Sequence, residues 1–466
     1  MILIITTMID FKRFFTYLFI FSFFLSSVNA KDLCQPDLNL PTYSDEDTET
    51  SSDKNPVFVY FDGSLSMQGY TKDQPGQKNL YRDVIDDLQQ ISENVGNKTF
   101  YHKFGSKVEP IKENEIAKVT KPGFYICSDS QAKCNNQETR LELPFKAAKA
   151  NKDATYVIVT DLFLSSKQLV GSTLSSLTKP LKSILKDGKS IGIVGVMSSF
   201  NGNIYDIPKK DGGTFKYTEA KKRPFYIIII GDQKNINQIK KNLEEQHFID
   251  AEDQYKFALI TSSPVLQNLN KNKVITEDNI ARISNSENFK FEYTGNNLPV
   301  YKFDTTKNRN LKFKINLDKV RVKSSSGISD YTIVDNIWTA SEKKCKNIKE
   351  WKKGKVKKIS EWKEDDTNLI IDLFAQKVFP LGNLLRGKKY FYTASIYANK
   401  PGKISEKEFE EWSIRDSDAE EFTDQNPVEF KTLNLTKIIK ILNSVAGDMF
   451  EPTLIANIAL NFNLTK

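Results

Sequence analysis

Four short runs of apolar residues, separated by stretches with helical spacing, constrain the fold of this chain more than any other feature. The runs occupy residues 56–61, 155–160, 190–197 and 224–230. A strand that is apolar on both faces is typical of a sheet covered by helices on both sides. The alternation of such strands with helices therefore predicts an α/β fold with a doubly wound, mostly parallel sheet.

The sequence changes in character near residue 285. Residues 288–293, 311–317 and 389–397 show β-rich or alternating patterns with no helical stretch between them. We therefore predict an α/β domain over residues 56–270 and a β-rich C-terminal domain over residues 285–466, which we expect to be a sandwich.

The tail of the chain combines two different patterns. Residues 435–442 have helical spacing, and the apolar residues of 458–464 alternate as in a strand. A last strand in the β-rich domain fits this alternation, and a return of the strand to the first domain is the alternative.

The first thirty residues predict a secretory signal peptide. Lys12 and Arg13 precede an apolar run at 14–25, and small residues at 28–30 fit a cleavage site. An uncut anchor is the alternative, although the run is short for a bilayer span. Residues 31–55 are polar and acidic and predict a flexible leader. We expect the mature chain to be secreted, periplasmic or on the cell surface, with no transmembrane segment left after cleavage.

Export would place the four cysteines in an oxidising compartment. We predict a disulfide between Cys127 and Cys134, which would close a small loop. Cys34 and Cys345 would then pair with each other or stay unpaired, because sequence alone does not fix the pairing. A structural zinc site is disfavoured because no pair of cysteines has the C-x-x-C spacing.

Composition and charge exclude some classes of function. The chain is 39% hydrophobic and 27% charged, which excludes a polytopic membrane protein and a wholly disordered chain. Its two histidines, His102 and His247, are too few for a histidine-rich metal enzyme. The net charge is +8, with the densest lysines at 343–358. We interpret that run as a solvated face, with a polyanion-binding patch as the alternative, and we predict no nucleic-acid partner.

Oxygen-bearing side chains follow two of the apolar runs. Asp62, Ser64 and Ser66 lie directly after the first run, and Asp161 lies directly after the second. Thr139 opens a predicted helix and could present its hydroxyl nearby. Ligands of open α/β sheets bind at the carboxyl ends of the strands, and carboxylate and hydroxyl oxygens suit Mg²⁺, Ca²⁺ or Mn²⁺.

This constellation resembles the metal-ion-dependent adhesion site of the von Willebrand factor type A domain. The family pattern is D-x-S-x-S, a later Thr and a later Asp after a buried strand, and the five residues just named match it. The Met that usually follows the second Ser in the family is present as Met67. The resemblance covers residues 56–260. The sequence departs from the pattern at Leu65 and Leu162, where the family has glycine, and at 201–223, which predicts a hairpin where the family has a helix.

The resemblance implies binding by coordination. The five residues would hold Mg²⁺, Ca²⁺ or Mn²⁺, and an Asp or Glu carboxylate of a protein partner would complete the coordination of the ion. We therefore expect a binding protein and not an enzyme. The alternatives are a scaffold of an envelope complex with a purely structural metal site and, less favoured, an exported hydrolase.

Overall fold

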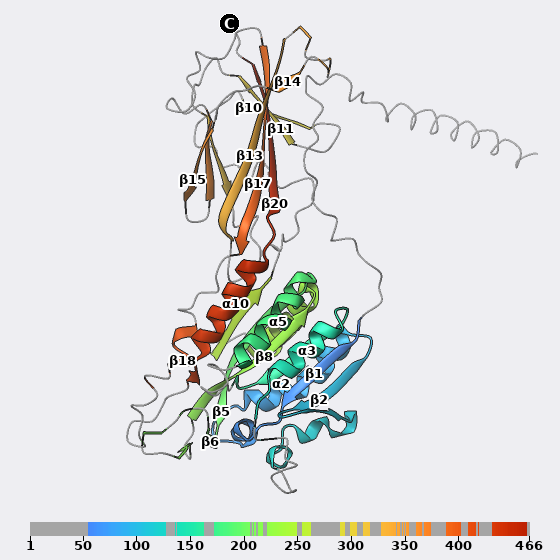
Figure 1. Cartoon of the computed structure of the whole chain (residues 1–466), viewed down its shortest axis with the longest axis vertical. Coiled ribbons are helices and arrows are strands. Elements are labelled where there is room, and N and C mark those ends of the chain that lie inside the picture. The colour runs from blue at the N-terminus through green and yellow to red at the C-terminus, as the bar shows by residue number, and fades with distance from the viewer. Residues whose placement is uncertain are drawn as a thin grey trace, which may run out of the picture.

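The computed structural model of the chain has an α/β layer and, beyond it, separate β-sheets (Figure 1). The predicted signal peptide, the acidic leader and the Cys127–Cys134 disulfide lie outside the residues that the structure describes. The described residues are 55–126, 136, 138–162, 172–205, 207, 209–210, 213–217, 221–248, 254–261, 289–293, 299–304, 311–316, 328–341, 343–344, 347, 349, 351–353, 360–365, 368–373, 388–401, 409–415, 418 and 431–463.

A mixed seven-stranded sheet forms the centre of the α/β layer, with the strand order β3-β2-β1-β4-β8-β5-β9. Strand β1 pairs in parallel with both β2 and β4. The predicted α/β class is therefore confirmed. The strands are β1 (Val57–Asp62), β2 (Thr99–Phe104), β3 (Val108–Ile111), β4 (Thr155–Thr160), β5 (Ser190–Phe200), β8 (Lys221–Gly231) and β9 (Tyr255–Ile260).

Strand β8 corrects one detail of the predicted topology. The sequence pattern predicts a further parallel strand there, whereas β8 lies between β4 and β5 and runs antiparallel to both. The reason is the connection, because β5 and β8 are joined through the small antiparallel pair β6 (Asn203–Ile204) and β7 (Phe215–Lys216). This is the hairpin predicted for residues 201–223, and it turns the chain straight back onto β5.

Helices cover both faces of the sheet and bury two separate apolar cores (Figure 1). One core contains the apolar faces of α2 (Leu80–Val95) and α6 (Gln233–Leu243). The other contains those of α3 (Glu142–Ala150), α5 (Ser172–Lys186) and α10 (Leu435–Met449). The strands between them are apolar on both faces because each face meets a helix layer.

Helix α10 comes from the far end of the chain and packs on the α/β layer beside α5. Lys182 of α5 and Asp448 of α10 form an ion pair of 3.0 Å between Nζ and Oδ2. The sequence-based boundaries assign this helix to the C-terminal domain, yet its apolar face belongs to the core of the first. The buried residues of α10 are Leu435, Ile438, Ile439, Leu442, Val445 and Ala446.

The segment before α10 also contacts the α/β layer. Trp412 is buried over β5, where a Cβ atom on Gly195 would lie 2.8 Å from its ring. The hydroxyls of Tyr226 in β8 and Thr432 are 3.0 Å apart and share a hydrogen bond. The short strands β18 (Ser413–Ile414) and β19 (Thr432–Leu433) pair with each other in this segment. The described residues 409–415 and 431–450 therefore attach the β-rich part of the chain to the sheet.

The described residues beyond the α/β layer form two further sheets. One has the order β10-β11-β20-β17-β13-β14, and the other has the order β12-β16-β15. The last strand, β20, pairs with β17 and β11, so the tail strand belongs to the β-rich part. No helix among the described residues is long and apolar enough to span a membrane. The strands are β10 (Phe289–Tyr293), β11 (Pro299–Asp304), β12 (Leu311–Asn316), β13 (Ile328–Ser341), β14 (Lys352–Lys353), β15 (Ser360–Asp365), β16 (Asn368–Leu373), β17 (Lys388–Pro401) and β20 (Thr453–Asn463).

Aromatic side chains of β1, β2 and β4 stack on one face of the sheet. The rings of Tyr60 and His102 lie nearly parallel, with centroids 4.8 Å apart, and Phe58 stacks on Phe100 and Tyr156. Burial lowers the pKa of His102. The Nδ1 atom of His102 has no hydrogen-bond partner within the described part of the chain. The folded protein therefore favours the neutral imidazole.

Replacing Ile439 by alanine tests the docking of α10. The side chain of Ile439 is fully buried in the α/β core, so its truncation should lower the free energy of unfolding by about 2–5 kcal/mol. Urea unfolding followed by circular dichroism measures this change. Ser444→Ala on the exposed side of the same helix is the control and should change the free energy of unfolding by less than about 0.5 kcal/mol. Equal effects of the two substitutions would contradict the docking.

The lowered pKa of His102 predicts a loss of stability on the acid side. In the unfolded chain a histidine titrates at about 6.5, whereas folded His102 takes up its proton at lower pH. The unfolded state binds more protons between those two values, so the free energy of unfolding falls as the pH drops below about 6.5. Thermal unfolding across this range should show the slope in His247→Gln and not in His102→Phe. A slope that persists in His102→Phe would refute the assignment.

Candidate functional site

Two carboxylates leave the sheet at the same edge. Strands β1 and β4 are parallel neighbours, with Phe61 opposite Val159 in register. Asp62 ends β1 and Asp161 directly follows β4, so both lie at the carboxyl ends of adjacent strands. Their side chains are 1% and 0% exposed. A buried pair of carboxylates at this edge is costly unless hydrogen bonds or a cation compensate the charge.

The carboxylate of Asp62 accepts hydrogen bonds from three stretches of the chain. The backbone N–H of Ser64 donates to Oδ1 over 2.9 Å. The hydroxyl of Thr139 lies 3.3 and 3.2 Å from the two carboxylate oxygens. The hydroxyl of Thr160 donates to Oδ2 over 2.7 Å. The loop after β1, the start of the α3 region and the end of β4 therefore meet at one side chain.

The two serines of the loop lie side by side. The Oγ atoms of Ser64 and Ser66 are 2.9 Å apart and share a hydrogen bond, and both side chains are 4% exposed. Between them, the N–H of Leu65 donates to the carbonyl of Asn136 over 3.1 Å. Asn136 in turn donates from Nδ2 to the carbonyl of Tyr125 over 2.8 Å. Asn136, which belongs to no sequence motif, thus stabilises the D-x-S-x-S loop from outside it.

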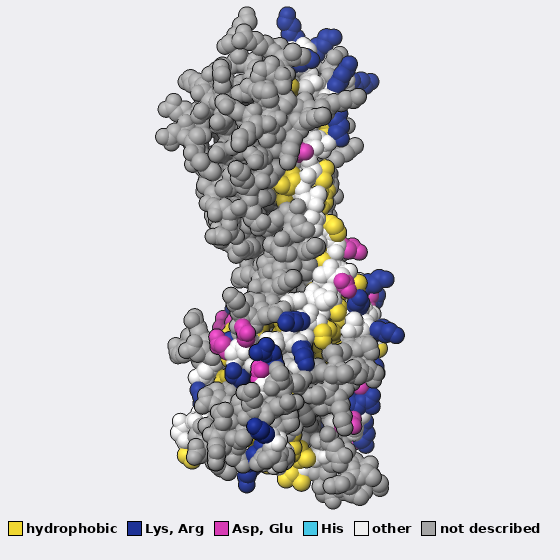
Figure 2. All heavy atoms as spheres, turned by 60° about the vertical axis from the view of Figure 1, so that its left-hand side comes forward, with side chains coloured by type: hydrophobic (Ala, Val, Ile, Leu, Met, Phe, Trp, Pro, Cys, Tyr) yellow, Lys and Arg dark blue, Asp and Glu magenta, His cyan; other side chains and the backbone are white. Residues whose placement is uncertain are grey.

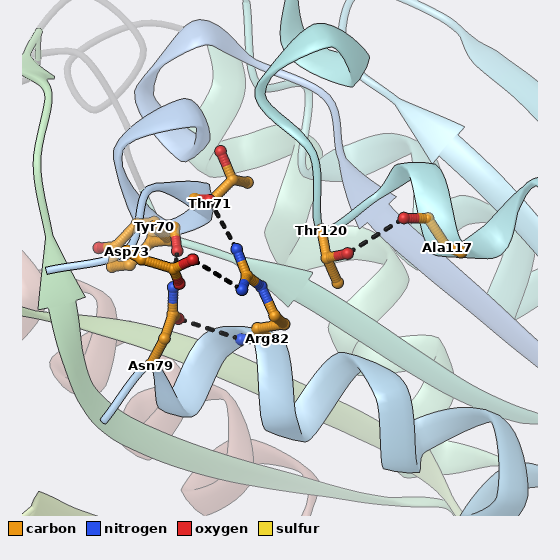
Figure 3. Close-up of polar contacts among 7 residues, drawn as sticks. All are labelled: Tyr70, Thr71, Asp73, Asn79, Arg82, Ala117 and Thr120. Atoms are coloured by element: carbon orange, nitrogen blue, oxygen red, sulfur yellow. Dashed lines mark hydrogen bonds and ion pairs between the residues drawn. The ribbon is translucent and has the colours of Figure 1, made fainter. Parts of the chain in front are cut away.

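The helical turn η2 (Leu65–Thr71), which begins within this loop, is fixed to the start of α2 (Figure 3). Arg82 reaches back with Nη1 to Asp73, 2.9 Å away, and with Nη2 to the carbonyl of Thr71, 3.3 Å away. Asn79 caps α2 by accepting from the N–H of Arg82 and donates from Nδ2 to the carbonyl of Tyr70 over 2.9 Å. These contacts hold the segment after Ser66 against the start of α2.

Thr160 is a further site residue, which the sequence pattern assigns only to the interior of its strand. It makes the shortest of the hydrogen bonds to Asp62 and also accepts from the N–H of Leu162 over 3.1 Å. The parallel register, which places Asp62 beside Thr160, is the signal that could have found it. Leu162 has a positive φ of 55°, a conformation that costs a non-glycine residue of order 1 kcal/mol. This is the position at which the family pattern has glycine.

Lys103 brings a positive charge to the same edge. Its aliphatic chain lies on Gly63, where a Cβ atom would be 2.2 Å from the lysine Cε, so a larger residue at position 63 would displace the lysine side chain. Its Nζ donates to the carbonyl of Phe124 over 2.7 Å and lies 4.6 Å from the centroid of the Phe124 ring. Burial lowers the pKa of Lys103, and the negative charges of Glu109 and Asp62 oppose that shift.

Burial dominates the electrostatics of the site. It raises the pKa of Asp62, and the hydrogen bonds from Ser64, Thr160 and Thr139 oppose that rise. Beneath the site the hydroxyls of Tyr81 and Tyr125 are 2.7 Å apart, and burial raises the pKa of both. The charges of Asp62 and Asp161 add to the shift at Tyr81. The two tyrosines are therefore neutral at physiological pH.

The donor set decides which ions the site could hold. Within the described part of the chain, no three His, Cys, Asp or Glu side chains lie together as a metal-binding group. The candidate set instead combines two carboxylates, Asp62 and Asp161, with the hydroxyls of Ser64, Ser66 and Thr139. All of these are hard oxygen ligands, which fit Mg²⁺, Ca²⁺ or Mn²⁺ and do not fit a soft metal.

Comparisons with known proteins place the chain in no family. No family model, no curated protein and no solved structure matches it. The chemistry of this edge of the sheet is therefore the basis for assigning a function.

Removing the Thr160 hydroxyl tests the hydrogen bonds at the centre of the site. Thr160→Val leaves Asp62 Oδ2 and the N–H of Leu162 without that partner, in a buried place. In a chelating buffer it should lower the free energy of unfolding by about 1–3 kcal/mol, as measured by urea titration.

The matched control is Thr120→Val. The hydroxyl of Thr120 is also buried, but it donates to the neutral carbonyl of Ala117 over 3.0 Å (Figure 3). Its loss should cost about 0.5–1.5 kcal/mol. If Thr160→Val costs no more than Thr120→Val, the carboxylate of Asp62 does not depend on Thr160.

Proposed function

We propose that this edge of the sheet binds a hard divalent cation and that the protein binds a partner protein through a carboxylate that completes the coordination of the ion. The observation that carries the proposal is the meeting of Asp62 with Thr139 and Thr160, which are 77 and 98 residues away along the chain. Two distant segments thus bring hydroxyl oxygens within hydrogen-bonding distance of the carboxylate of Asp62.

The residues that would hold the ion are Asp62, Ser64, Ser66, Thr139 and Asp161. A divalent ion there would supply concentrated positive charge for a partner's Asp or Glu. The three hydroxyl ligands add no negative charge to that of the two carboxylates, so the ion would keep more attraction for an incoming carboxylate than it would in a site built of carboxylates alone. The low exposure of the site strengthens that attraction, because charges interact more strongly away from bulk water.

The burial of the site limits the access of a partner protein to the ion. The five side chains are between 0% and 4% exposed, so a partner's carboxylate can reach them only after the covering chain moves. A binding step that requires such a movement is slower than a rigid encounter. We therefore expect association that is slow and that depends on the occupied site.

The same burial favours a second candidate function, which is a site used only to stabilise the fold within a larger assembly. In that case the cation would replace the hydrogen bonds that now compensate Asp62, and no partner carboxylate would take part. The two candidates make the same prediction for cation binding and opposite predictions for partner binding.

Cation binding is tested by thermal unfolding with and without Mg²⁺. An ion that binds only the folded chain should add about 2.7 kcal/mol at 100 times its dissociation constant. Asp62→Asn and Asp161→Asn should fold and lose this gain. Asp73→Asn, at a carboxylate that pairs with Arg82, is the control and should keep it. Equal gains in all four proteins would refute the site.

Partner binding is tested by capture from an envelope extract on the immobilised protein. The proposed function predicts proteins that are retained with Mg²⁺, released by EDTA and absent from the Asp62→Asn column. A stabilising effect of Mg²⁺ with no EDTA-sensitive capture would support the purely structural site instead.

A further inference from the structure

One short segment accounts for the whole net positive charge of the protein. Residues 343–358 contain nine lysines and one glutamate, a net charge of +8, and the entire chain also has a net charge of +8. The remaining residues are therefore neutral in sum. A general preference for lysine across the sequence does not produce such a distribution, because it would spread the excess over the chain.

The structure places the described lysines of this segment on an exposed end of the β-rich part. They lie on β14 and in the turn that leads to it from β13, and each is exposed. Strand β14 is at the edge of its sheet. Figure 1 places it at the end of the long axis away from the α/β layer, and Figure 2 shows blue side chains gathered at that end. We call this group the lysine tip: Lys343, Lys344, Lys349, Lys352 and Lys353.

The lysine tip is held by a buried aromatic residue. Trp351, in the middle of the segment, is 8% exposed and packs edge-on against Phe391 of β17, with ring centroids 6.1 Å apart. Lys352 and Lys353 follow it directly and pair with Thr339 and Trp338 of β13. Two of the five charges are therefore carried on an anchored strand, whose backbone loses little conformational entropy when it presents them to a surface.

Protection of a sheet edge explains only part of this arrangement. Lysines on edge strands prevent edge-to-edge association, which accounts for Lys352 and Lys353. It does not account for Lys343, Lys344 and Lys349, which lie outside the strand. A cluster of four to eight such charges is the size that binds anionic lipid headgroups.

We propose that the lysine tip binds a membrane surface rich in anionic phospholipid. Lysine ammonium groups act as point charges that suit an array of phosphates with no fixed geometry, whereas specific phosphate recognition favours arginine. Single-stranded nucleic acid needs exposed aromatic rings for stacking, and the Trp351 ring is buried. The tip would hold the protein at a bilayer while the α/β layer, at the other end of the long axis, stays clear of it (Figure 1).

Flotation of the full chain with vesicles tests this proposal. Vesicles of phosphatidylcholine with about one third phosphatidylglycerol should bind the protein more tightly than pure phosphatidylcholine, and added salt should weaken the difference. Any insertion of the N-terminal apolar run contributes to both vesicle types and cancels in the comparison. Replacing the five lysines of the tip by glutamine should reduce the preference for anionic vesicles at least about 100-fold.

The control variant loses the same charge elsewhere. Glutamine at five exposed lysines of the α/β layer should leave the preference within about threefold of wild type, because charges beyond a Debye length of the bilayer contribute little. An equal loss in both variants, or no preference in wild type, would overturn the proposal. Tighter binding to a DNA duplex than to the vesicles, per phosphate, would overturn the choice of lipid. The control positions are Lys112, Lys121, Lys146, Lys149 and Lys152.

Discussion

The buried carboxylate of Asp62 is the constraint on which the candidate site depends. A carboxylate with 1% exposure needs hydrogen-bond partners, and here the N–H of Ser64 and the hydroxyls of Thr139 and Thr160 supply them. Satisfying one side chain therefore fixes the ends of β1 and β4 and the approach to α3 relative to one another. The same requirement makes the edge a natural place for a cation, because a cation would compensate Asp62 and Asp161 together.

The strands of the α/β layer can be predicted from the sequence because buried strands consist almost entirely of apolar residues. A run such as that of β4 is apolar on both faces, which only a helix-covered sheet requires. The same property does not indicate whether a strand runs parallel or antiparallel to its neighbours, since β8 would be equally buried as a parallel strand. The place of α10 is also hidden. Its apolar face predicts a helix, but nothing in its spacing says that it packs on α5 instead of on the β-sheets that flank it in sequence.

The residues of the candidate site that belong to a sequence motif can be predicted from the sequence. The residues that the register of paired strands brings to the site cannot. Asp62 and Asp161 can be placed at the same edge of the sheet because each stands at the carboxyl end of a buried strand and the two strands are parallel neighbours. Thr160 is read as part of its strand, yet as the last residue of β4 it donates to Asp62. Lys103 gives no local signal either, since its contact with Gly63 depends on the pairing of β1 with β2.

The most direct measurement is an anomalous difference map from crystals of the protein grown with Mn²⁺. The account predicts one strong peak at the end of β1, within about 2.0–2.6 Å of oxygen atoms of the D-x-S-x-S loop. It should vanish in crystals washed with EDTA. Crystals that diffract well and show no peak between Asp62 and Asp161, or show manganese only elsewhere, would contradict the account.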